Sequence, residues 1–208
     1  MIGIFGGTFD PPHLGHSTLA ESVWHHCRLS QIRWIPLNQA VHKTQPLANP
    51  AQRLAMVQAA IAGYPTFYAD PCEIERRGPS YMVDTLTTLH TQLPGQTLCL
   101  MIGSDTFSQL SRWKTPHQIL QLAHLIVVRR ADHPQTPPAN LTLHNADTTA
   151  DLHQCSAGLV YQHTITPPAI SSTAIRSALT QGDQTISRHL SPAVWALIRQ
   201  QKLYQPAT

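Results

Sequence analysis

The chain has 208 residues, and its 14 basic and 11 acidic side chains give a formal net charge of +3. This length predicts a single domain over residues 1–208, and so mild a charge, without a basic run, does not support a nucleic-acid partner. Four scattered cysteines predict neither a disulfide framework nor a zinc site, and the apolar stretches are too short to span a bilayer. With a first strand expected to start at Met1, no room remains for a leader, so we expect a cytoplasmic protein without a membrane partner.

A glycine-containing loop follows the first predicted strand, which covers residues 1–5. Two adjacent glycines open the loop, and glycine lets a ligand approach the main chain closely. Helical spacing of apolar residues over 17–24 predicts that a helix comes next. Free N–H groups at such a helix start favour an anion, and His13 and His16 would add donors there. The alternative is a structural glycine turn with two surface histidines.

The rest of the chain alternates between strand and helix patterns. Strands are predicted over residues 31–36, 66–69, 97–102, 124–128 and 160–164, and helices beginning near Pro50, Ser80, Pro116, Ser171 and Pro192. The charged connector 71–78 is expected to be a solvated face, and residues 131–157 show no clear period. This alternation predicts an α/β fold with a parallel sheet.

Polar residues follow the best central strand, residues 97–102, which is continuously apolar. Ligands of open α/β sheets bind outside the carboxyl ends of the strands, so Asp105 is either a ligand contact or a turn former. Arg129 and Arg130 end the next strand and point to the same edge.

A hydroxyl-rich segment, residues 170–176, begins a helix late in the chain. Its serines and threonine could simply cap the helix. The same hydroxyls, with free N–H groups and Arg176 about one turn on, would bind phosphate equally well.

These segments together resemble a known superfamily. The run His13-Leu14-Gly15-His16 is similar to the first signature of the nucleotidylyltransferases, and Ile170-Ser171-Ser172-Thr173-Ala174-Ile175-Arg176 is similar to the second. Within that superfamily, the blocks at 80–81, 102–105, 113 and 124–130 resemble those of bacterial nicotinate-nucleotide adenylyltransferases. The resemblance implies a doubly wound, Rossmann-like parallel sheet, and transfer of the adenylyl group of ATP to nicotinate mononucleotide with release of pyrophosphate.

The resemblance also implies roles for individual residues. The catalytic set would be His13, His16, Lys43 and Arg176. ATP would contact Gly6, Gly7, Thr8, Phe9, His13, His16, Gly103, Asp105, Ser171, Ser172, Thr173 and Arg176. The mononucleotide would contact Asn38, His42, Lys43, Ser80, Tyr81, Met82, Trp113, Lys114 and Arg130. Mg²⁺ would arrive with ATP, without a dedicated protein ligand.

Two positions depart from the family pattern. Ala40-Val41 stand where two prolines usually precede the His-Lys pair, and Met82 stands where threonine is common. Two other functions compete with this one. One is a sibling transferase acting on phosphopantetheine or a cytidylyl acceptor, against which stand the length and the blocks at 80–81 and 113. The other is a nucleotide-binding regulator that has lost catalysis, which would be expected to lack a motif histidine or Arg176, and all are present. The sequence predicts no oligomeric state.

Overall fold

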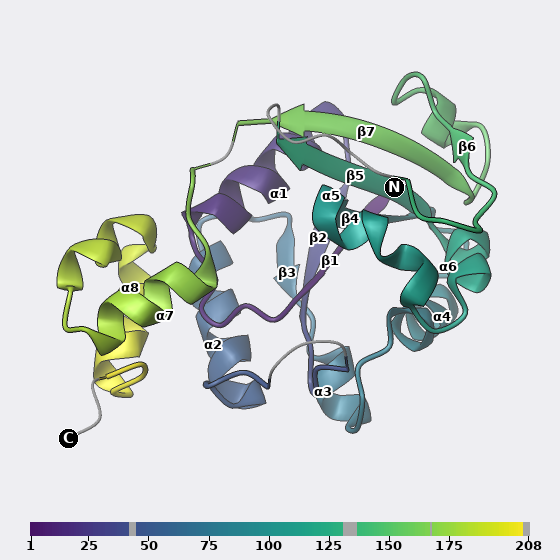
Figure 1. Cartoon of the computed structure of the whole chain (residues 1–208). Helices are drawn as coiled ribbons and strands as arrows, with labels where there is room; N and C mark the ends of the chain where they lie inside the picture. The colour runs from purple at the N-terminus through teal and green to yellow at the C-terminus, as the bar shows by residue number, and fades with distance from the viewer. Residues whose placement is uncertain (42–44, 131–136, 167, 206–208) are drawn as a thin grey trace.

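The computed structural model describes residues 1–41, 45–130, 137–166 and 168–205, except for the side chain of Arg130. The strands are β1 (Ile2–Gly7), β2 (Gln31–Pro36), β3 (Phe67–Ala69), β4 (Leu98–Gly103), β5 (His124–Arg130), β6 (His144–Asn145) and β7 (Leu159–Ile165). They form one sheet in the order β3-β2-β1-β4-β5-β7-β6, and every neighbouring pair is parallel (Figure 1). The predicted parallel α/β sheet is therefore confirmed.

Helices cover both faces of this sheet. They are α1 (Leu14–His26), α2 (Pro50–Ile61), α3 (Cys72–Arg76), α4 (Met82–Gln92), α5 (Ser104–Ser108), α6 (Pro116–Leu122), α7 (Ser172–Thr180) and α8 (Pro192–Gln200). Short 3-10 turns lie at η1 (Leu110–Arg112), η2 (Asp151–His153) and η3 (Gln184–His189). In the described part of the chain, no helix is long and apolar enough to cross a membrane.

The period-two alternation of the strands creates two separate cores. In β4, Leu98 and Leu100 pack in the cluster that includes α4 and α6, whereas Cys99 and Met101 pack in the cluster that includes α1 and α2. Successive side chains of a strand point to opposite faces, so one apolar strand contributes to both cores. The winding is therefore double, as the family resemblance implied.

A third cluster extends the molecule beyond the sheet. Helices α7 and α8 lie beside α2, at one side of the molecule (Figure 1). Met56 of α2 is buried there against Ile175 of α7 and Val194 of α8. This packing fixes the start of α7 relative to α2.

The chain reverses its direction of winding between β1 and β4. Strands β2 and β3 follow on one side of β1, while β4 pairs with its other side through Ile2–Leu98, Gly3–Cys99 and Ile4–Leu100. The loops that leave the carboxyl ends of β1 and β4 diverge to opposite faces, and such a switch point is where open α/β sheets bind ligands. The first signature begins at this point.

The prediction that the charged connector is a solvated face is right for Glu75 and Arg77, which are exposed, but wrong for Glu73. Residues 72–76 form α3, and Glu73 is buried, with 3% of its surface exposed. Its carboxylate accepts a 2.6 Å hydrogen bond from the Thr85 hydroxyl, and Arg76 donates to the same hydroxyl at 3.0 Å. The Thr85 hydroxyl thus bridges Glu73 and Arg76, and composition alone does not reveal a contact with a residue of the next helix.

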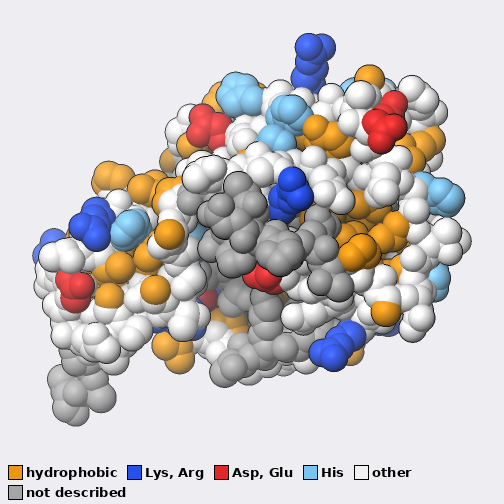
Figure 2. All heavy atoms as spheres, turned by 45° about the horizontal axis from the view of Figure 1, so that its top comes forward, with side chains coloured by type: hydrophobic (Ala, Val, Ile, Leu, Met, Phe, Trp, Pro, Cys, Tyr) orange, Lys and Arg blue, Asp and Glu red, His pale blue; other side chains and the backbone are white. Residues whose placement is uncertain are grey.

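Charged side chains are spread thinly on the face seen in Figure 2. There, Lys and Arg occur singly among uncharged and acidic side chains, rather than in one continuous patch. A nucleic-acid-binding face normally gathers its cations, because the phosphate backbone supplies most of the affinity. This view therefore adds no support for a nucleic-acid partner.

Candidate active site

The two glycines that end β1 are closely approached by neighbouring side chains, and neither has an unusual backbone angle. Gly6 and Gly7 are the last residues of β1, paired with Ile35 and Pro36 of β2. A Cβ on Gly6 would lie 2.6 Å from the terminal methyl of Met82, and one on Gly7 would lie 2.8 Å from the ring of Phe9. The left-handed residue of this loop is Phe9, at φ 49°, so the alternative of a structural glycine turn is not supported.

The histidine pair lies at the start of α1, as the sequence predicted. The rings of His13 and His16 are 3.8 Å apart between centroids, and His13 is the residue before the first helical turn. The ring of His16 also lies against Phe9, at 5.2 Å, and Phe5, at 6.0 Å. His13 is buried and His16 partly buried, so the alternative of two surface histidines is excluded.

The charge state of His16 follows from these contacts. Burial, and then the neighbouring His13, hold the pKa of His16 well below its usual value of 6.5. Its Nδ1 accepts a 3.1 Å hydrogen bond from the main-chain N–H of His13. The neutral ring therefore carries its proton on Nε2, and this N–H is a donor that needs no titration near pH 7.

The low pKa of His16 predicts a pH-dependent stability. The unfolded chain takes up a proton on this residue near pH 6.5, whereas the folded chain does not until its own lower pKa is reached. The free energy of unfolding should therefore be undiminished above about pH 6.5 and should fall progressively below it. Urea unfolding at about pH 7.5 and about pH 5.5 measures this difference.

The matched variant for that measurement is His16→Gln. Burial also lowers the pKa of His124 and of His163, and both histidines remain in the variant. The change in the free energy of unfolding between the two pH values therefore differs between wild type and variant only through His16. We expect this change to be smaller in the variant. Equal changes would contradict the low pKa of this ring.

Asp10 joins several distant segments, and the sequence analysis did not single it out. Only 2% of its surface is exposed. Its carboxylate accepts hydrogen bonds from the N–H groups of Leu47, at 2.9 Å, and Ala48, at 3.1 Å. The hydroxyl of Tyr204 donates to the same carboxylate at 2.6 Å. Asp10 thus ties the loop after β1 to the loop before α2 and to the residues after α8.

The second signature reaches the first across more than 160 positions. Arg176 donates from Nη1 to the main-chain oxygen of Asp10, at 2.7 Å, and the Ser172 hydroxyl donates to the main-chain oxygen of Pro11, at 2.8 Å. Nη2 of Arg176 lies 3.3 Å from the Thr173 hydroxyl. Ser171 caps α7 by accepting the Ala174 N–H at 3.1 Å. The capping alternative therefore holds for Ser171, while Arg176 lies at the glycine-containing loop.

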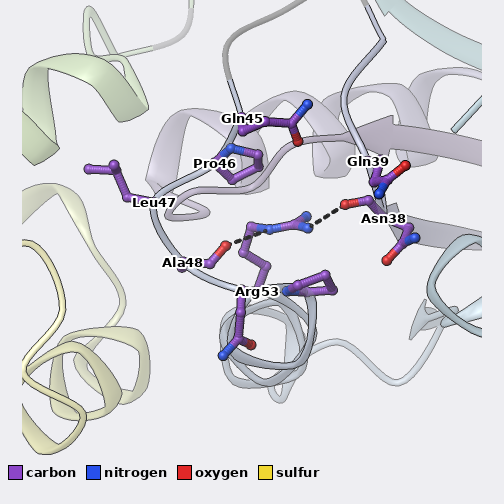
Figure 3. Close-up of a pocket in the computed structure, with 9 residues that line it drawn as sticks. Asn38, Gln39, Gln45, Pro46, Leu47, Ala48 and Arg53 are labelled. Carbon is purple, nitrogen blue, oxygen red and sulfur yellow. Dashed lines mark hydrogen bonds between the residues drawn. The ribbon is translucent and has the colours of Figure 1, made fainter. Parts of the chain in front are cut away.

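A buried arginine stabilises the loops around this region. Arg53 of α2 is 0% exposed, and burial lowers the pKa of its guanidinium. It donates to three main-chain oxygens, those of Thr8 at 3.0 Å, Asn38 at 3.3 Å and Ala48 at 3.1 Å, two of which are drawn in Figure 3. One local signal could have identified it: Arg53 precedes Val57 by four positions, so it shares the apolar face of α2.

A hollow of about 360 Å³ lies beside Arg53. Figure 3 shows its lining, which is Asn38, Gln39, Gln45, Pro46, Leu47, Ala48, Asn49, Pro50 and Arg53. Of the residues expected to bind the mononucleotide, it contains Asn38. The N–H of Asn38 donates to the Ser80 hydroxyl at 2.8 Å, so two residues expected at this site are in direct contact.

Three of the remaining expected mononucleotide contacts, Tyr81, Met82 and Lys114, lie at the start of α4 or contact its first turn. Tyr81 precedes this helix and Met82 is its first residue, so the Met82 N–H has no partner within the helix. Lys114 pairs with Asp84 at 3.0 Å and lies 4.7 Å above the ring of Tyr81. Trp113 is partly buried and packs against the core cluster that includes α4 and α6. The ammonium of Lys114 is thus engaged by α4, and its role toward a substrate stays a prediction.

The structure gives fewer contacts for the other expected site residues, and some of them lie outside the described residues. Gly103 ends β4, and Asp105 is exposed in the first turn of α5, at the switch point. Arg130 ends β5, but its side chain is outside the described residues, as are His42 and Lys43. Among the residues that are described, no group of three or more His, Cys, Asp or Glu could hold a metal ion.

The fold and this site define a class of nucleotide-transferring α/β protein, and the comparisons agree. The cytidylyltransferase-like family model matches residues 4–178. A "Probable nicotinate-nucleotide adenylyltransferase" of Coxiella burnetii (strain Dugway 5J108-111) is 38% identical, covering 99% of this chain and 98% of the relative. One of the same name from Methylococcus capsulatus is 37% identical over 98% of this chain and 99% of the relative. The chain belongs to the nicotinate-nucleotide adenylyltransferase family.

A solved structure agrees with the fold. The Plasmodium falciparum nicotinic acid mononucleotide adenylyltransferase, in its complex with NaAD, superposes with a TM-score of 0.75 over 98% of this chain and 96% of that chain. The two sequences are 18% identical. At this identity the likeness establishes the nucleotidylyltransferase fold that the resemblance implied.

Proposed function

We propose that the chain transfers the adenylyl group of ATP to nicotinate mononucleotide, giving nicotinate adenine dinucleotide and pyrophosphate in NAD biosynthesis. The relatives that carry this activity in their names align with nearly the whole chain. The single observation that carries the proposal is the contact of Arg176 and Ser172 with the loop after β1, beside the histidine pair. This contact brings the start of α7, with its arginine and hydroxyl, to the start of α1, with its histidines, at the switch point of the sheet. Both helix starts are suited to binding phosphate.

The reaction is an in-line displacement. A phosphate oxygen of the mononucleotide forms a bond to the α-phosphorus, and the bond from that phosphorus to the bridging oxygen of pyrophosphate breaks. The attacking oxygen is already an anion, so no general base is required. Positioning and charge stabilisation then supply most of the rate enhancement.

The chain's own residues divide these tasks. The Nε2–H of neutral His16 would donate to oxygens of the α-phosphoryl as charge develops there, and His13 would support it. Arg176, Ser172 and Thr173 would hold the leaving pyrophosphate end. Lys43 would neutralise the acceptor or the triphosphate.

Mg²⁺ would enter with ATP and neutralise charge on the triphosphate oxygens. The described residues fit a metal that the nucleotide brings with it, because the buried carboxylate of Asp10 already accepts three hydrogen bonds from protein donors. The cytoplasmic location stays a prediction from the sequence.

The acceptor assay tests the proposed function. Pyrophosphate release should be measured with ATP against nicotinate mononucleotide, its amide analogue and phosphopantetheine. Turnover with phosphopantetheine alone would replace the proposal with a sibling transferase. ATP binding without turnover of any acceptor would indicate a regulator.

We expect the acid mononucleotide to be preferred over the amide by at least about tenfold in kcat/KM. The N–H groups of Met82 and Lys114 would each meet one carboxylate oxygen, whereas a carboxamide would turn its NH₂ toward one of these donors. An unsatisfied buried donor costs about 1–3 kcal/mol. Met82→Ala should keep the preference, because its donor is main-chain, and Trp113→Ala should weaken both substrates. Equal efficiencies for acid and amide would refute this arrangement of donors.

A further inference from the structure

The carboxylate of Asp10 lies close to Arg176 without a direct hydrogen bond to it. Nη1 of Arg176 is 3.8 Å from Oδ2 of Asp10. The three donors that reach the two carboxylate oxygens are all neutral: the N–H groups of Leu47 and Ala48 and the hydroxyl of Tyr204. A separation of 3.8 Å is too long for a hydrogen bond, so the charges attract but do not share a proton.

This separation leaves Arg176 able to bind an anion. Its Nη1 donates to the main-chain oxygen of Asp10 at 2.7 Å, and its Nη2 contacts the Thr173 hydroxyl at 3.3 Å. A direct ion pair with the carboxylate would instead use the N–H groups that a phosphate needs, since both anions bind guanidinium through paired hydrogen bonds. The acceptors that hold Arg176 now are neutral, and its charge remains uncompensated at hydrogen-bonding distance.

Tyr204 is the one side chain among the three donors to Asp10. Its hydroxyl donates to Oδ1 at 2.6 Å, from a ring that is 8% exposed in the cluster formed by α2, α7 and α8. Burial and the nearby Asp10 raise the pKa of Tyr204, so its hydroxyl is a protonated donor near neutral pH. Its position is fixed by the same packing that fixes α7, which carries Arg176.

We propose that Tyr204 is a positioning residue for ATP: by donating to Asp10 it keeps this carboxylate from pairing directly with Arg176, and so leaves the guanidinium open to the triphosphate. The inference rests on the proposed adenylyl transfer. Without the hydroxyl, Oδ1 loses a donor in a buried place, and the carboxylate can turn toward Arg176, whose Nη1 already lies 3.8 Å from Oδ2. The carboxylate would then compete with ATP for the same N–H groups.

The test is Tyr204→Phe, which removes one oxygen and keeps the packed ring. We expect the KM for ATP to rise about five- to twentyfold, because charge-assisted hydrogen bonds are roughly twice as strong as neutral ones. The KM for nicotinate mononucleotide and kcat at saturating ATP should stay within about twofold of wild type. Calorimetry with Mg²⁺ and ATP alone should show the same loss of affinity, independently of any acceptor.

Tyr161→Phe is the matched control. Tyr161 lies in β7, and its hydroxyl makes a 2.6 Å hydrogen bond with His26 of α1. Removing this hydroxyl should leave both Michaelis constants unchanged. Unchanged ATP affinity in Tyr204→Phe, even with lower stability, would overturn the proposal. A rise in the mononucleotide KM of equal size would also overturn it, because it would show a general loosening of the loops. Wild type that binds ATP but fails to adenylylate the mononucleotide would instead contradict the proposed function.

A double variant separates competition from simple loss of packing. Asp10→Asn removes the charge that would capture Arg176, so adding Tyr204→Phe to it should change the ATP affinity by less than about twofold. If adding Tyr204→Phe to Asp10→Asn weakened ATP binding as much as Tyr204→Phe does alone, the hydroxyl would act by some route other than this carboxylate. That result would overturn the proposal.

Discussion

His16→Ala is expected to lower kcat by about two to three orders of magnitude, the usual effect of removing a donor aimed at transition-state charge. The reason lies in the state of the ring: His16 is neutral, and its Nδ1 is occupied by the His13 N–H, so Nε2–H is available for the reacting phosphoryl. The KM values should change less than kcat, because the interaction strengthens only as charge develops. Steady-state kinetics with both substrates varied measures this.

The control for His16→Ala is His90→Ala, an exposed histidine in the last turn of α4. It should be indistinguishable from wild type. Because His16 packs against Phe5 and Phe9, urea unfolding must show that the His16 variant is folded at the assay temperature. Turnover of a folded variant within threefold of wild type would refute the assignment.

Arg176→Ala is expected to reduce kcat/KM for ATP by about 10- to 150-fold, since a hydrogen bond to a charged group is worth about 1.5–3 kcal/mol. Arg176 lies at the loop after β1 and donates its hydrogen bonds to neutral oxygens, so the variant loses a cation that is otherwise able to bind phosphate. Binding of nicotinate mononucleotide alone should hardly change. Calorimetry with each substrate separately measures the two affinities.

Arg199→Ala is the matched control, an exposed arginine in the last turn of α8. It should bind ATP as wild type does. If Arg176→Ala weakened the mononucleotide and left ATP binding intact, Arg176 would belong to the acceptor side of the site.

The sheet was predictable because its signals are local. Continuous apolar runs and period-two alternation identify strands such as β2 and β4 without reference to the rest of the chain. Helix starts were equally readable, since Asn49 and Ser191 cap α2 and α8 as their positions before proline predict. The order of the strands, in contrast, depends on pairing between distant segments and was not predicted; the family resemblance implied only that the sheet is doubly wound.

The site was predictable only in part, because several of its residues are defined by distant contacts. Asp10 interacts with Ala48, 38 positions away, and with Tyr204, 194 positions away, and no local pattern shows either contact. Glu73 was assigned to solvent for the same reason: its partner Thr85 lies in the next helix. The glycines were recognised as special, but the close approach of Met82 to Gly6 is a property of the folded sheet.

The buried guanidinium of Arg53 has a consequence for how freely this family can vary its sequence. It binds only main-chain oxygens, on the segments that follow β1, follow β2 and precede α2. Main-chain acceptors are the same whatever side chain a residue carries. The loop around Ala40 and Val41 can therefore exchange side chains while Arg53 still holds both ends of it, through the main-chain oxygens of Asn38 and Ala48.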